Sequence, residues 1–139
     1  MADLTLSVAH RAARTAASIA LADTGARRSA IHIYTAPPAS GGVLLAVIAL
    51  QKPCGALVPE TGRARLMPAE GAAPLCVGAG IATWGEWVSG VGDVIAAGPA
   101  AAEGTPEAAD ACFIITDTES GTAQLYSGGT LTLADMIVG

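Results

Sequence analysis

Asp117 and Thr118 are the residues whose types most directly suggest chemistry. They lie in the stretch IITDTESGTAQLYSGG after a run of hydrophobic residues, as the catalytic aspartate of an aspartic protease does. Such an enzyme needs two neighbouring carboxylates, one protonated and one ionised, so a chain this short would have to contribute Asp117 twice as a dimer. Glu119 stands where the protease pattern requires glycine. We therefore expect Asp117 to be the corner of a β-hairpin in which Gly121 supplies a positive φ.

No other set of residues in the sequence predicts catalysis, a metal site or a cofactor. The chain has only two histidines, His10 and His32, which are too few for a histidine metal site or a catalytic dyad. Its cysteines, Cys54, Cys76 and Cys112, form no CxxC pair and are predicted to be buried, reduced thiols. The glycine-rich turns lack the GxxxxGK[ST] pattern of a phosphate-binding loop. The sequence thus predicts a protein that is not an enzyme and has no cofactor.

Composition favours contact with other protein chains. Charged residues make up 14% of the 139 residues and apolar residues 52%, whereas charged residues average about 25% in soluble domains. A surface with so few charges suits large permanent protein contacts. The net charge of −5 argues against nucleic acid as a partner. The longest apolar run, residues 43–50, is far shorter than the roughly 20 residues that span a bilayer, so no membrane partner is expected.

The periodicity predicts a single domain over residues 1–139, with a helical segment in residues 1–26 and a β-sandwich in residues 27–139. The helix is expected from Ser7 to Asp23, with Thr5 or Ser7 as its cap and Gly25 at its end. A signal peptide cleaved from this segment is not expected, and the cysteines fit an intracellular site of synthesis. The predicted buried face contains Val8, Ala12, Ala16, Ile19 and Ala20. The opposite face, left for solvent or a partner, contains His10, Arg11, Arg14 and Ser18.

The rest of the chain predicts seven or eight strands. Residues 30–35 alternate with a period of two, and residues 43–50 are apolar on both faces, so this second strand should lie centrally. Residues 51–74 contain four prolines and are predicted to be a long loop system with short or edge strands at GALV and RARLM. Two more strands are expected in residues 79–97, followed by a loop in residues 99–110. The last thirty residues predict three strands in two hairpins, and the fold class is an all-β, antiparallel jelly-roll-like sandwich.

The two tryptophans are the first candidates for contact with a partner. Trp84 and Trp87 are three residues apart, so in a strand they would point to opposite faces. One would then fill the core while the other anchors an interface. The alternative, that both lie in the core around a glycine bend, stays open at this point.

The order of these features resembles that of small tailed-bacteriophage virion proteins. The resemblance rests on the alanine-rich helical N-terminus, AIHIYTAPP, GGVLLAVIAL, the Gly/Trp segment and ACFIITDTESGTAQLYSGGTLTL, and it points to the capsid cementing, or decoration, proteins of the Bordetella-phage type. It implies a jelly-roll-like homodimer that is made in the host cytoplasm and lies on the outer surface of the virion. There it would tie neighbouring major capsid proteins together without an active site.

On this hypothesis, residues 130–138 (TLTLADMIV) add as a strand to a neighbour's sheet. The interface is then expected to involve Trp84, Trp87, Arg11, Arg14, Leu131, Leu133 and Ile137. Two other functions fit the same pattern. One is a different phage head–tail or tail structural protein, and the other is a carbohydrate-binding β-sandwich that uses Trp84 or Trp87 as a stacking platform.

Overall fold

A computed structural model describes residues 4–70, 74–116 and 121–138. The elements follow along the chain in this order: α1 (Val8–Ala22), β1 (Ala30–Tyr34), the 3-10 helix η1 (Pro38–Ser40), β2 (Leu44–Val58), β3 (Arg63–Pro68), β4 (Gly80–Ile81), β5 (Trp84–Val88), β6 (Val94–Ala102), the 3-10 helix η2 (Pro106–Asp110), β7 (Phe113–Thr116), β8 (Gln124–Leu125), β9 (Thr132–Leu133) and β10 (Met136–Val138). The chain is therefore mostly β with one N-terminal α-helix, as the sequence predicts.

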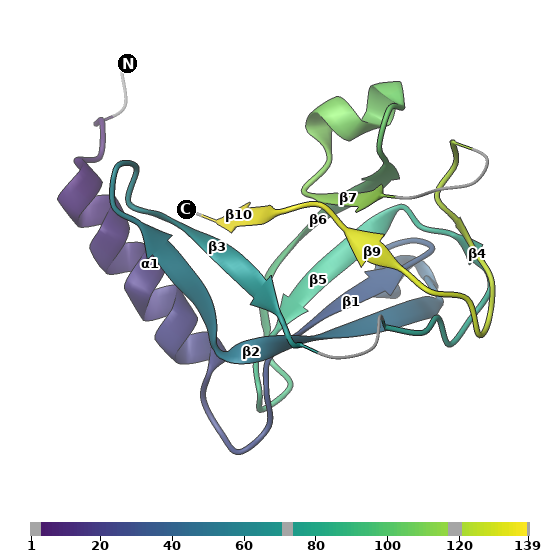
Figure 1. The fold of residues 1–139 in the computed structure, drawn as a ribbon, viewed down its shortest axis with the longest axis horizontal. Coiled ribbons are helices and arrows are strands. Elements are labelled where there is room, and N and C mark those ends of the chain that lie inside the picture. Colours follow the sequence, from purple (N-terminus) through teal and green to yellow (C-terminus); the bar gives the residue numbers. More distant parts are fainter. Residues whose placement is uncertain (1–3, 71–73, 117–120, 139) are drawn as a thin grey trace.

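Eight strands form one large sheet in the order β10-β3-β2-β1-β5-β6-β7-β9, and β4 and β8 form a separate two-stranded ribbon. The strands at the two ends of this order, β9 and β10, are consecutive in the sequence, with only Ala134 and Asp135 between them. One short segment therefore pairs with β7 through its first half and with β3 through its second half. The sheet is nearly closed on itself as a result (Figure 1).

The core lies on the concave side of this sheet and follows the register of its strands. Paired residues in antiparallel strands share a face. Ile31 of β1 pairs with Ile48 of β2 and with Trp87 of β5, and all three side chains are buried. Ile33 of β1 is also fully buried. The alternation that predicted β1 from the sequence therefore places its isoleucines in the core.

Helix α1 has the ends that the sequence predicts. The Ser7 hydroxyl accepts a hydrogen bond from the backbone N–H of His10, and Asp23 follows the last helical residue. The helix packs against β2 and β3 at one side of the sheet (Figure 1). Its capping follows the usual preference for serine at this position.

The buried face of α1 agrees only in part with the predicted one. Of the predicted face, Ile19 packs against the core and Ala12 is partly buried, whereas Val8, Ala16 and Ala20 are exposed. The fully buried residues are Thr15 and Ala22. Thr15 can be buried because its hydroxyl donates to the carbonyl of the residue one turn earlier at 2.8 Å, which removes the cost of an unpaired polar group. Alanine contributes little apolar area on either face, so the sequence pattern left the orientation poorly determined.

Residues 51–54, predicted to be loop, continue β2, and the predicted short strand GALV at residues 55–58 is the end of the same strand. Leu50 pairs with Pro68 of β3 and Gly55 pairs with Leu66, so four residues of β2 face one residue of β3 in a bulge. Both side-chain oxygens of Asp23 accept from the backbone N–H of Cys54 at 3.2 Å. The Asp23 carboxylate thus accepts from a backbone N–H that has no partner in the irregular strand pairing. The predicted short strand RARLM is β3, which lies inside the sheet between β2 and β10.

The two predicted C-terminal hairpins do not form. Strand β7 pairs in parallel with β6 and antiparallel with β9, while β8 pairs with β4. Phe113 and Ile115 share an inward face as expected, but Ile115 pairs with Leu133, and Leu125 pairs with Gly80. Residues 99–102, predicted to be loop, belong to β6, and η2 lies in the connection that makes the parallel step. Turn residues show where a chain reverses, but they do not show which strand it meets next.

Candidate functional site

The protease-like aspartate cannot be placed. Asp117 and Glu119 lie outside the described residues. The strands on either side of them, β7 and β8, do not pair with each other as the predicted hairpin requires, although Gly121 has the expected positive φ of 67°. Among residues 4–70, 74–116 and 121–138, no three His, Cys, Asp or Glu side chains gather as metal ligands would.

The cysteines divide into two kinds. Cys54 and Cys76 are buried as predicted, but Cys112 is exposed, which corrects the expectation of three buried thiols. Burial raises the pKa of the Cys54 thiol to about 11, so this group is a neutral part of the core. Cys112 lies just before β7, beside the backbone of Gly98, where strand alternation turns Phe113 inward and leaves its neighbour outside.

The tryptophans point to opposite faces of β5. Trp87 belongs to the buried core row and is only 2% exposed, so its side chain is closed to a partner. Trp84 pairs with Tyr34 of β1 and with Pro99 of β6 on the outer face, where it is half-buried. The prediction of one core and one outward tryptophan holds. Trp84 is the one that a partner or ligand can reach.

A polar pair lies next to Trp84 on the same outer face. The hydroxyl of Tyr34 is 3.4 Å from Nδ1 of His32. Burial lowers the pKa of His32, and the nearby carboxylate of Glu86 opposes this shift. The imidazole is therefore held mainly in its neutral form at neutral pH.

The C-terminal segment is used within its own chain. Leu131 is buried at 2% exposure, and Leu133 is partly buried against the core. Ile137 pairs with Arg65 on the outer face and is exposed. Residues 132–138 pair with β7 and β3 within their own chain. Because β9 and β10 are the end strands of the sheet, addition of this segment to a neighbour's sheet stays a prediction. Of the three C-terminal residues predicted at the interface, Leu131, Leu133 and Ile137, only Ile137 has an exposed side chain.

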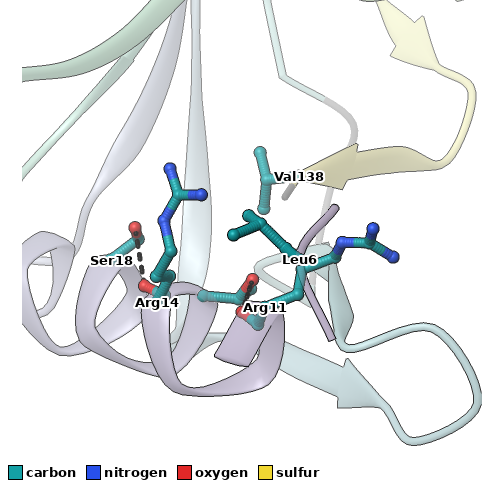
Figure 2. Close-up of a pocket in the computed structure, with 6 residues that line it drawn as sticks. Leu6, Arg11, Arg14, Ser18 and Val138 are labelled. Carbon is teal, nitrogen blue, oxygen red and sulfur yellow. Dashed lines mark hydrogen bonds between the residues drawn. The ribbon is translucent and has the colours of Figure 1, made fainter. Parts of the chain in front are cut away.

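Arg11 and Arg14 lie on α1 beside a small pocket, which Figure 2 shows between the helix and the end of β10. Arg11 is partly buried and Arg14 is exposed. The Arg11 guanidinium donates to the backbone carbonyl of Thr61 in the β2–β3 turn at 3.0 Å. Both arginines are thus accessible, as their predicted role in contact with a partner requires.

A group of exposed apolar side chains was not predicted from the sequence. Four side chains on the β4–β8 ribbon and the segment leading to it are 55–68% exposed, and we call them the ribbon patch: Leu75, Val77, Ile81 and Tyr126. The patch is held to the main sheet because Cys76 bridges Ala46. Leu75 and Val77 flank the buried Cys76, so they point outward together. This alternation was the available signal, and it lay at the end of a region interpreted as loop.

Comparison of the chain with known protein families, with curated proteins and with solved structures gives no match. Within the described part of the chain, α1 is too short to cross a bilayer and no other helix is long enough.

Proposed function

We propose that this chain is a structural virion protein that binds the outside of an icosahedral capsid and cements neighbouring major capsid proteins. The observation that carries the proposal is the ribbon patch. Exposed apolar side chains gathered on one small element are typical of contact sites in soluble proteins, and the ribbon is fixed to a large, nearly closed sheet. A rigid scaffold lowers the entropy lost on binding.

The identity of the partner comes from the sequence resemblance. Decoration proteins of the type that it indicates are jelly-roll-like dimers on the outer capsid surface, and the same arrangement is proposed here. The acidic net charge of −5 suits a position away from packaged DNA. Many copies of one modest interface around a shell would hold it together by multivalency.

The first test is the copy number and position of the chain in purified particles. Hundreds of copies on the outer shell would support cementing. Six or twelve copies at the neck or tail would instead support the alternative of a head–tail or tail structural protein. Absence from the shell surface would overturn the proposal.

A pair of substitutions tests the ribbon patch itself. Ile81→Ser with Tyr126→Ser should weaken binding to undecorated capsids by about 30-fold or more, the effect of losing an interface hot spot. Val94→Ser is the matched control, because this valine is also exposed but lies in β6, outside the patch. Unchanged binding by the double variant would show that the contact lies elsewhere.

Carbohydrate binding remains a second candidate because of the outward face of β1 and β5. Tyr34 and Trp84 are paired there and half-buried, and such rings can stack on sugars. Trp87 is excluded as a platform by its burial. Binding on a glycan array that is lost in Trp84→Ala would favour this function over cementing.

A further inference from the structure

A small pocket lies between α1 and the end of β10. Its volume is about 120 Å³, and it is lined by Leu6, Arg11, Arg14, Thr15, Ser18 and Val138. Figure 2 shows the guanidinium groups of Arg14 and Arg11 on either side of Leu6 and Val138. The pocket therefore combines an apolar middle with two cationic rims.

The two arginines are the available hydrogen-bond donors of this pocket. Among the described residues, the Arg14 guanidinium has no hydrogen-bond or ion-pair partner. Arg11 uses one N–H group on the Thr61 carbonyl at 3.0 Å, and a guanidinium carries five. The ion pair that the structure shows, Arg65 with Asp135 at 3.5 Å, involves neither of them.

The two hydroxyl groups that line the pocket are not free to donate to a ligand. The Thr15 hydroxyl donates to the Arg11 carbonyl at 2.8 Å, and the Ser18 hydroxyl donates to the Arg14 carbonyl at 3.1 Å. Both hydroxyl protons are thus taken by the helix backbone. None of the described residues that line the pocket is a carboxylate, so they include neither the ligands that a metal ion prefers nor the strong acceptors that would hold a sugar.

We propose that this pocket binds a carboxylate carried on a short apolar stem, as on a glutamate side chain presented by another protein. The arginines would hold the carboxylate by charge-assisted hydrogen bonds, and Leu6 and Val138 would cover the stem. The size agrees, because a cavity of about 150 Å³ holds one benzene molecule. A pocket near 120 Å³ therefore accepts a side chain and not a nucleotide.

The pocket adds a specific contact to the proposed function, but its ligand chemistry does not depend on that function. The identity of the partner rests on the proposed function, under which the glutamate belongs to the major capsid protein. The chemistry of the pocket rests on the residues that line it. Separate experiments can therefore fail separately.

Pentanoate and its neutral isostere pentanamide test the chemistry of the pocket on the full chain. The methyl NMR signals of Leu6 and Val138 should shift on titration with pentanoate and stay in place with pentanamide. Arg14→Gln should weaken pentanoate binding about three- to fivefold, the effect of losing one exposed charge pair. Arg28→Gln, which removes an exposed arginine outside the pocket, should leave binding unchanged.

A second variant keeps the charges and blocks the space. Ser18→Leu should fill the pocket and also abolish the pentanoate shifts, with thermal unfolding used to show that each variant is folded. Equal shifts with pentanamide, tighter binding of inorganic phosphate than of pentanoate, or unchanged binding in both Arg14→Gln and Ser18→Leu would overturn the proposal.

Binding to undecorated capsids tests the partner. Arg14→Gln should lower capsid binding while Arg28→Gln does not. If Arg14→Gln loses pentanoate but keeps full capsid binding, the partner assignment is overturned and the cementing function is not. If the wild-type chain does not bind capsids at all, the proposed function fails, and the pentanoate result still decides the pocket.

Discussion

Gly85 is the position where one added methyl group should disturb the core most directly. It lies in β5 and pairs with Ile33 of β1 and with Gly98 of β6. A Cβ on Gly85 would lie 2.5 Å from Cδ2 of Phe113 and 2.8 and 2.9 Å from two further ring atoms. Carbon atoms in optimal contact are about 3.5–4.0 Å apart, so the ring would have to move by about 1 Å. Phe113 is only 6% exposed, which leaves it little room.

The expected cost of Gly85→Ala follows from this overlap. Overpacking a closely packed core costs about 1–3 kcal/mol. Strand β5 is hydrogen-bonded on both sides, so the backbone cannot shift without disturbing β1 and β6. Unfolding should then occur roughly 3–10 °C below the wild-type temperature, since about 1 kcal/mol corresponds to a few degrees in a chain of this size.

Circular dichroism at increasing temperature measures this effect, and a double-mutant cycle assigns it to the ring. In Phe113→Leu the side chain is smaller, so Gly85→Ala should cost at least about 1 kcal/mol less in that background than in the wild type. A wild-type melting temperature for Gly85→Ala, or strictly additive effects, would refute the assignment of this glycine to the space of the ring.

Three further outcomes follow from burial. Native protein should react rapidly with one equivalent of a thiol reagent at Cys112, and not at Cys54 or Cys76; a Cys112→Ser variant that still reacts rapidly would contradict this. Burial raises the pKa of Cys54 from 9.0 to about 11, so its contribution to stability is complete below pH 9.0 and is lost as pH rises to about 11. The free energy of unfolding measured with urea should therefore fall over that range by about 2 kcal/mol more in the wild type than in Cys54→Ala. Equal slopes of this free energy against pH in the two proteins would refute the prediction. Burial lowers the pKa of His32 below its usual 6.5, so its contribution is present above pH 6.5 and is lost on acidification. The loss of stability on acidification should be smaller in His32→Gln and unchanged in the control His10→Gln, because His10 is exposed. Equal loss of stability in both variants would contradict this prediction.

Helix ends, strands and side-chain faces were predictable where residues close together in the sequence determine them. Ser7 as the cap of α1, the alternation of residues 30–35 in β1, and the opposite faces of Trp84 and Trp87 all follow from nearest-neighbour geometry. The central position of β2 followed from its unbroken apolar run.

Pairing between distant segments was not predictable from the same signals. The turn residues after β7 fitted a hairpin with β8, but β7 pairs with β9, with Ile115 opposite Leu133. The bulge in β2 depends on the Asp23 carboxylate, which lies 31 residues earlier than Cys54. The interface prediction was wrong for Trp87 and Leu131 for the same reason. Both side chains are apolar enough for an interface, but distant strands cover them in the core.

The short segment that carries β9 and β10 also has a consequence for synthesis. Strands β3 and β7 each present an unpaired edge until residues 132–138 have left the ribosome, because those residues supply the ladder on both. Unpaired edges are the part of a sheet that joins other chains by mistake. A nascent chain stalled before Thr132 should therefore be prone to aggregation, although most of its core residues have already been made.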